Sequence, residues 1–221
     1  MIDSADIQLR IHGVPTGPDY YRLMTILALK EVSWQHSSNL PAVVRQSLKS
    51  DCTLPVMQYG NNYFEGSMIA TLALEQIQPA HSLFPNGNKG MPLALGWWSD
   101  AFYRDVSSSE NPVLLHRHCT LISRQLDNGR EYLQGGEPGL ADVHSYSPLK
   151  ALQVEGYDLS EVMDAMPLLS NWYQRVDALR DIAPVARLLE KLSADYPECD
   201  SIAEKVILAD GNGCLWRTSL V

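Results

Sequence analysis

One short stretch in the first third of the chain constrains its fold more than any other. It reads Leu54-Pro55-Val56-Met57, then a polar turn, then Tyr63-Phe64-Glu65-Gly66-Ser67. Because proline has no backbone N–H, Pro55 belongs at the first strand residue, at a sheet edge or in a cis bond at a special turn. The Gly60-Asn61-Asn62 run tolerates the positive φ angles of a tight hairpin turn. The stretch predicts a proline-initiated β-hairpin that leads directly into a helix.

The residues that open this helix are suited to binding an anion. Glu65-Gly66-Ser67 places small polar groups and unpaired backbone N–H groups at the helix N-terminus. This end of a helix carries partial positive charge, which favours a bound carboxylate. The alternative is that Glu65 only stabilises the helix dipole.

Hydrophobic periodicity divides the chain into a mixed part and a helical part. Before residue 80 it predicts strand, helix, strand, helix, strand, strand and helix, over Ile7–His12, Tyr20–Lys30, Val32–Ser37, Pro41–Leu48, the hairpin and Ser67–Gln78. After a loop rich in proline and glycine it predicts only helices, over Met91–Val106, Pro112–Leu133, Leu140–Val154, Pro167–Leu179 and Pro184–Leu192, and then an irregular tail from Ser193. We therefore expect two domains, residues 1–80 and 90–221.

Composition and charge exclude several kinds of partner. The 221 residues carry a formal net charge of −9, which argues against nucleic acid and anionic membranes. No segment approaches the about 18 apolar residues of a membrane span, and the N-terminus has no signal-peptide pattern. Four cysteines without regular spacing predict free thiols in a reducing cytoplasm and no metal site, namely Cys52, Cys119, Cys199 and Cys214.

The hairpin and helix start resemble the glutathione-binding half of the cytosolic glutathione S-transferase family. The resemblance implies a thioredoxin-like N-terminal domain followed by an all-helical C-terminal domain. It also implies that the backbone of Leu54, before a cis Pro55, pairs with the cysteinyl part of glutathione. Glu65 and the next residue would hold the γ-glutamyl carboxylate. The family has serine at that next position, where this chain has Gly66 followed by Ser67.

Two motifs in the helical half extend the resemblance. Glu137-Pro138-Gly139-Leu140-Ala141-Asp142 is similar to the family's Pro-Ser-Leu-Ala-Asp stretch, in which the aspartate completes a capping box. Here the cap is Gly139, and glycine costs only a few tenths of a kcal/mol relative to serine. The segment from Met166 to Trp172 is similar to the family's Tyr-Pro-x-Leu-x-x-Trp entry to a late helix.

The group that activates the thiol departs from the family pattern. The alignment puts Gly17 where the family has a catalytic serine or cysteine, which marks an atypical member. Thr16 and Tyr20 are the nearest candidates to donate a hydrogen bond to the glutathione sulfur. The alternatives are that Thr16 is a turn residue and that Tyr20, with Tyr21, is a half-buried helix face.

The acceptor side has two interpretations. Trp98 and Phe102 could line an acceptor pocket between the domains, or they could form a core stripe at helical spacing. His116 and His118 face different sides of a helix, so they do not form a metal pair.

The leading hypothesis is a glutathione-dependent transferase that adds or exchanges the glutathione thiolate on a small electrophile. Glutathione would be a co-substrate, and the family resemblance implies a homodimer. The alternative is a non-catalytic binding or regulatory protein, because Gly17 and Gly66 remove two family hydroxyls. A third hypothesis is a thiol oxidoreductase with Cys52 as its nucleophile.

Overall fold

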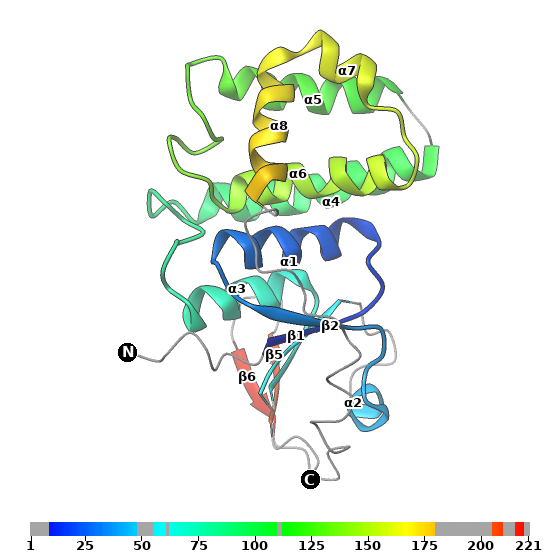
Figure 1. The fold of residues 1–221 in the computed structure, drawn as a ribbon, viewed down its shortest axis with the longest axis vertical. Coiled ribbons are helices and arrows are strands. Elements are labelled where there is room, and N and C mark those ends of the chain that lie inside the picture. Colours follow the sequence, from blue (N-terminus) through cyan, green and yellow to red (C-terminus); the bar gives the residue numbers. More distant parts are fainter. Residues whose placement is uncertain are drawn as a thin grey trace.

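The computed structural model describes residues 9–47, 55–60, 62–109 and 112–179, together with the backbone of 205–209 and 215–218. The mixed region contains β1 (Leu9–His12), α1 (Gly17–Leu29), β2 (Trp34–Ser37), α2 (Ala42–Ser47), β3 (Val56–Tyr59), β4 (Asn62–Glu65) and α3 (Ser67–Ile77). The helical region contains α4 (Gly90–Ser109), α5 (Pro112–Leu126), α6 (Leu140–Val154), α7 (Ser160–Ala165) and α8 (Pro167–Leu179). The predicted element order of the first 80 residues is confirmed (Figure 1).

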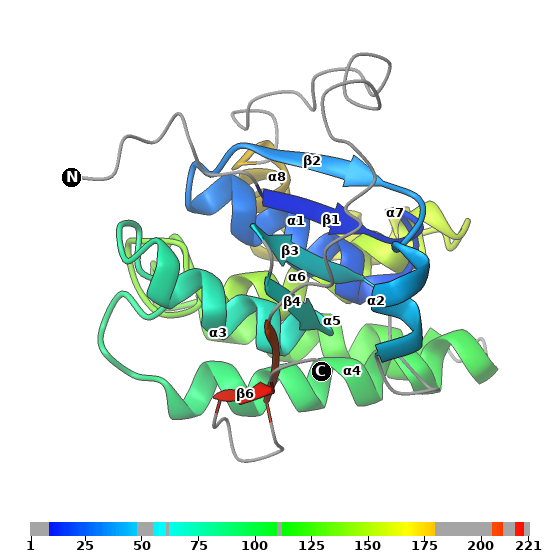
Figure 2. The ribbon, with the colours of Figure 1, turned by 90° about the horizontal axis from the view of Figure 1, so that it is seen from below.

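The sheet is mixed and begins with strands in the order β2, β1, β3 and β4 (Figure 2). β1 runs parallel to β2 and antiparallel to β3, and β3 and β4 form the predicted antiparallel hairpin. Gly60 in the hairpin turn has φ of 56°, a conformation that glycine adopts without strain. Pro55 is buried immediately before β3, as predicted, whereas Leu54 lies outside the described residues.

The end of the chain differs from the prediction. Two further strands, β5 (Lys205–Ala209) and β6 (Leu215–Thr218), form an antiparallel pair, and β5 pairs in parallel with β4. The expectation that residues 90–221 are all helical is therefore wrong for these strands. The pairing supplies partners for backbone groups that β4 would otherwise expose at a sheet edge. The helix predicted over Pro184–Leu192 lies outside the described residues.

Helices α1 and α6 join the two parts of the molecule. α1 lies between the sheet and α6 (Figure 1), and it contacts both α3 and α6. All residues of α1 from Tyr20 onward are buried. Leu140 and Val143 of α6 belong to the hydrophobic cluster built on α1 and the sheet, whereas Tyr146 belongs to the cluster of the helical region. The domain interface is therefore a continuous packed core.

None of the helices in the described part of the chain has the length and apolar character needed to cross a membrane.

One buried carboxylate accepts the hydrogen bonds that fix the N-terminus of α6. Asp142 is 0% exposed, and its Oδ2 accepts a hydrogen bond from the backbone N of Gly139 at 3.0 Å. Its Oδ1 accepts from the backbone N of Leu133 at 2.8 Å and from Nε1 of Trp172 at 2.7 Å. The predicted capping contact of Asp142 is confirmed. The predicted extension of the preceding helix to Leu133 is wrong, since α5 ends at Leu126 and the N–H of Leu133 pairs with Asp142 instead.

Steric crowding explains why the α6 cap is glycine. A Cβ on Gly139 would lie 2.8 Å from Cδ of Pro85 and 3.1 Å from the carbonyl oxygen of Leu83. The first neighbour is a proline ring and the second is backbone, so neither yields easily. A serine at this position therefore has no room, even though serine is the better cap elsewhere.

Gly139→Ser is expected to lower the free energy of unfolding by about 1–3 kcal/mol, because overpacking outweighs the capping gain. Chemical denaturation monitored by circular dichroism measures the change. Gly136→Ser is the matched control, since no atom lies within 4 Å of a Cβ there, and it should change stability by less than about 0.5 kcal/mol. A Gly139→Ser protein as stable as wild type would contradict the steric explanation.

Candidate functional site

The N-terminus of α3 carries the residues expected to bind a carboxylate. Gly66 is the N-cap residue with φ of 79°, and no side chain caps the helix there. The first N–H groups of a helix have no partner within the helix, so they are available to an anionic ligand. Glu65 ends β4 and is half-buried beside this point.

The N-terminus of α1 has the same character. Thr16 is the exposed N-cap residue, and its hydroxyl makes no capping hydrogen bond. The next residue, Gly17, has φ of 74°, a conformation that strains any residue with a Cβ. The glycine at the expected position of the catalytic hydroxyl is therefore required by the local backbone.

Tyr20, the second candidate donor, is only 8% exposed. Its ring lies edge-on to Tyr21, with centroids 5.8 Å apart, and edge-on to His36 at 6.1 Å. This packing resembles the half-buried helix face that was the alternative interpretation. Thr16 is the more accessible of the two hydroxyls.

Ser67 contacts α1 through its side chain. It is 3% exposed, and its Oγ accepts a hydrogen bond from Nη1 of Arg22 at 2.8 Å and donates one to Asp19. The first turn of α1 and the first turn of α3 are therefore in direct contact. The Ser67 hydroxyl is engaged in this contact.

Arg22 connects three helices. Its side chain is 1% exposed, its Nη1 lies 2.7 Å from Oδ1 of Asp19, and its Nη2 pairs with Asp100 of α4. We call Asp19, Arg22, Ser67 and Asp100 the Arg22 cluster. The sequence analysis missed it, although an arginine in the middle of the apolar run of α1, three residues after an aspartate, was a usable signal.

The Arg22 cluster carries a net negative charge, with one guanidinium between two carboxylates. The side chains of Asp19 and Asp100 are 41% and 43% exposed, so each presents oxygen atoms to solvent. His144 of α6 is completely buried, and burial, with the nearby charge of Arg22, holds its pKa well below the usual value. His144 is therefore neutral and adds no positive charge to this junction.

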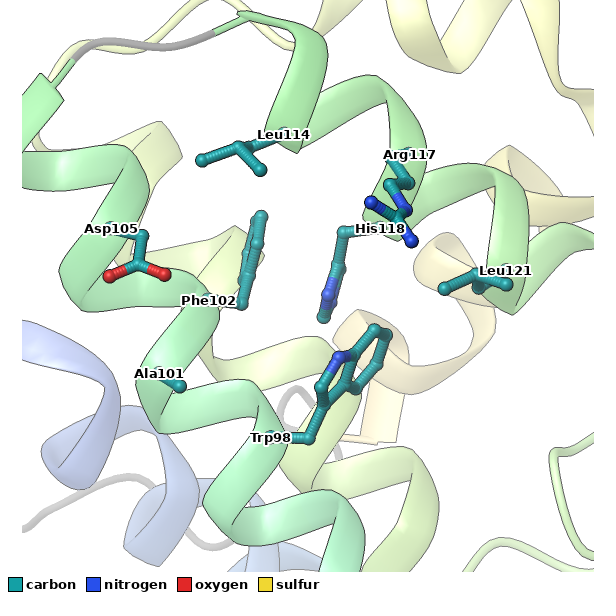
Figure 3. A pocket seen from close by; sticks show the side chains of 8 residues that line it. All are labelled: Trp98, Ala101, Phe102, Asp105, Leu114, Arg117, His118 and Leu121. Carbon is teal, nitrogen blue, oxygen red and sulfur yellow. The ribbon is translucent and has the colours of Figure 1, made fainter.

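Trp98 and Phe102 line a cavity, but not between the domains. The cavity is about 300 Å³ in volume, and all the residues that line it belong to α4 and α5 (Figure 3). Phe102 is also part of the helical core, which agrees with the interpretation of a core stripe. His116 is exposed whereas His118 is buried, which confirms that they face different sides.

The described cysteine is not a nucleophile. Cys119 is completely buried, and burial raises the pKa of its thiol to about 12, so it is not ionised at neutral pH. Cys52, Cys199 and Cys214 lie outside the described residues. Within the described ranges, no three His, Cys, Asp or Glu side chains gather in a way that could hold a metal ion.

Comparison with known proteins identifies one domain of the chain. Residues 102–179 match the model of the glutathione S-transferase C-terminal domain. No curated protein has significant sequence similarity to the chain.

Solved structures share the fold at low sequence identity. The chain is similar to a GST-like protein from Pseudomonas syringae, with 23% identity over 78% of this chain and 67% of that one and a TM-score of 0.64. It is similar to a glutathione S-transferase from Rhodospirillum rubrum F11, with 18% identity, coverages of 77% and 88%, and a TM-score of 0.64. A glutathione S-transferase from Methylobacillus flagellatus, solved with bound glutathione, has 16% identity, coverages of 80% and 100%, and a TM-score of 0.62. The chain therefore carries a match to the glutathione S-transferase C-terminal domain over residues 102–179 and shares the fold of these structures.

Proposed function

We propose that the protein binds glutathione at the adjoining N-termini of α1 and α3 and directs its thiolate onto a small electrophile. The observation that carries the proposal is the contact between Asp19 and Ser67, which brings two helix N-termini without side-chain caps together. Each N-terminus favours negative charge. Glutathione supplies suitable groups, among them the α-carboxylate of its γ-glutamyl residue and, once ionised, its thiolate.

The proposed site places the γ-glutamyl end of glutathione at α3 and its cysteinyl thiol at α1. The backbone N–H groups that follow Gly66, with Glu65 beside them, bind the γ-glutamyl end. The exposed carboxylate oxygens of Asp19 and Asp100 suit its α-ammonium group. The backbone of Leu54, which precedes Pro55, pairs with the cysteinyl backbone; this assignment rests on the family resemblance. The bound glutathione in the Methylobacillus flagellatus relative supports the choice of ligand.

The proposed chemistry depends on ionising the thiol. A cysteine thiol has a pKa near 8.5, and a hydrogen-bond donor or a helix N-terminus lowers it by stabilising the thiolate. Thr16 and the N-terminus of α1 fill this role. The thiol proton leaves to solvent, and the sulfur lone pair forms a bond to the electrophilic atom of the acceptor. In a substitution, the bond from that atom to its leaving group breaks and the group departs with the electron pair, as chloride does from a chloronitrobenzene. In an addition, the electron pair of the acceptor double bond takes up a proton from solvent.

Thr16→Val is expected to raise the pKa of bound glutathione by about one to two units, since a hydrogen bond to a charged group contributes about 1.5–3 kcal/mol. Thiolate absorbance against pH measures the shift, and the rate with a chloronitrobenzene acceptor at neutral pH should fall in parallel. Tyr20→Phe is the comparison variant, because that ring is buried. A shift in Tyr20→Phe but not in Thr16→Val would transfer the role to Tyr20.

Binding itself is tested by calorimetry with glutathione and by retention on immobilised glutathione. Saturable binding together with turnover of the acceptor supports the enzyme. A folded protein that takes up no glutathione contradicts the proposal. Light scattering on the same sample tests whether the protein forms the homodimer that the family resemblance implies.

A second candidate function is a binding protein without catalysis. Two observations favour it: Gly17 supplies no hydroxyl, and the hydroxyl of Ser67 is engaged with Arg22 and Asp19. Glutathione binding with unchanged thiol pKa and no turnover would establish this alternative.

A further inference from the structure

The cavity between α4 and α5 contains a stack of three rings. The imidazole of His118 lies between Phe102, with ring centroids 3.6 Å apart and planes 10° apart, and Trp98, at 4.1 Å and 21° (Figure 3). Trp98 and Phe102 are one helical turn apart on α4, so both rings reach the same side. Leu114 and Leu121 of α5 add apolar surface. The cavity therefore has flat aromatic walls.

His118 has unused hydrogen-bonding capacity in this cavity. It is 2% exposed, and neither ring nitrogen has a hydrogen-bond partner in the part of the chain that the structure describes. Burial lowers the pKa of His118 to about 3, so the ring is neutral and offers one N–H donor and one acceptor nitrogen. Buried polar atoms are almost always paired, because leaving them unpaired is costly. A ligand or water that reaches this ring gains a hydrogen bond.

The charges around the cavity select for a neutral ligand. Asp105 of α4 and Arg117 of α5 lie on opposite sides of the stack (Figure 3). These opposite charges balance, and the imidazole between them is uncharged. The volume of about 300 Å³ is at the lower end of small-molecule sites. The walls, charge and size therefore suit a small flat molecule without net charge.

We propose that this cavity is a binding site for small neutral aromatic molecules that carry one hydroxyl or ring N–H, which hydrogen-bonds to His118. Trp98 is the outer ring of the stack and is 36% exposed. Exposed side chains change rotamer rapidly, and a turn of Trp98 opens the edge of His118 to the ligand. The ligand ring then takes a place in the stack.

This site is separate from the proposed glutathione site. On α4, Asp100 contacts Arg22 of α1, whereas Trp98 and Phe102 stack on His118 of α5. Bound glutathione and the aromatic ligand therefore do not compete. The cavity site holds even if the protein binds no glutathione.

The test uses 2-naphthol and naphthalene, which share their rings and differ in the hydroxyl. Titration of the full chain, followed by calorimetry and tryptophan fluorescence, should show saturable binding of 2-naphthol and about tenfold weaker binding of naphthalene. His118→Leu should reduce 2-naphthol affinity about tenfold and remove the difference between the two probes. Saturating glutathione should leave both affinities unchanged.

Two further variants keep the test decisive. Leu121→Trp fills the mouth of the cavity at a residue that is 47% exposed, so the protein should fold and lose 2-naphthol binding. His116→Leu, on the exposed side of the same helix, should bind as wild type does. The proposal is overturned if wild type does not bind 2-naphthol, if His118→Leu and Leu121→Trp bind it unchanged, or if glutathione displaces it.

Discussion

Asp142→Ala is expected to lower the free energy of unfolding by about 3–6 kcal/mol. The carboxylate of Asp142 accepts hydrogen bonds from three buried donors, on Leu133, Gly139 and Trp172. Each buried donor left unpaired costs about 1–3 kcal/mol. Domains of this kind are stable by only about 5–15 kcal/mol, so one side chain accounts for a large share.

Burying the carboxylate of Asp142 costs desolvation free energy, and this cost predicts the order of stability among variants at this position. Burial raises the pKa of Asp142 because desolvation disfavours the charged carboxylate. The three hydrogen-bond donors stabilise the charged form and offset part of this effect. Asp142→Asn keeps one acceptor oxygen but brings an NH₂ group against an N–H donor. We therefore expect the free energy of unfolding of Asp142→Asn to lie between those of wild type and Asp142→Ala. Denaturant unfolding followed by tryptophan fluorescence reports directly on Trp172.

The matched control is Asp164→Ala on α7, an exposed aspartate, which should change stability by less than about 0.5 kcal/mol. If Asp142→Ala were no more destabilising than Asp164→Ala, the helical region would have to be held together by packing alone.

Local signals explain how much of the fold was predictable. The hairpin turn at Gly60, the entry proline Pro55 and the glycine at the start of α3 each act within a few residues, and each was placed correctly. α6 was predicted over its full length because its first turn carries a clear cap. Short α7, with six residues, is too brief for a periodic pattern and was missed.

Contacts between distant residues explain what was not predictable. The bond from Trp172 to Asp142 joins the two motifs of the helical half across 30 residues, and neither motif indicates the other. The positions of Trp98 and Phe102 show the same limit. Periodicity placed them on one face of a helix, but the partner of that face, α5 rather than the N-terminal domain, depends on how the helices pack.

In the candidate site, too, local features were predictable from the sequence and contacts between distant residues were not. The uncapped N-terminus of α3 follows from Gly66 and its neighbours, whereas the contact of Ser67 with α1 depends on Arg22, 45 residues earlier. From the sequence, Ser67 was expected to bind glutathione together with Glu65 and Gly66. The structure instead gives its hydroxyl a role between helices.

Arg22→Met is expected to lower the free energy of unfolding by about 2–4 kcal/mol. Methionine keeps an unbranched apolar stem of similar length but removes the guanidinium that donates to Asp19, Asp100 and Ser67. Asp19 keeps the hydrogen bond from the Ser67 hydroxyl. Breaking a fully buried ion pair costs about 3–5 kcal/mol. The value expected here is somewhat lower, because both carboxylates are partly exposed and regain water.

The same variant tests whether the Arg22 cluster positions the proposed glutathione site. Arg22 contacts residues in the first turns of both α1 and α3, so its loss should move the two helix N-termini relative to each other and weaken glutathione binding about tenfold or more. Asp100→Asn leaves the contacts of Arg22 with both first turns in place, weakens its contact with α4 and removes one of the two carboxylates proposed to face the α-ammonium group. It should therefore lower stability and weaken glutathione binding less than Arg22→Met does. Arg124→Met, at an exposed position of α5, is the control for loss of a positive charge. If Arg22→Met bound glutathione as tightly as Arg124→Met in calorimetry, the relative position of the two N-termini would not determine binding, and the cluster would act on stability alone.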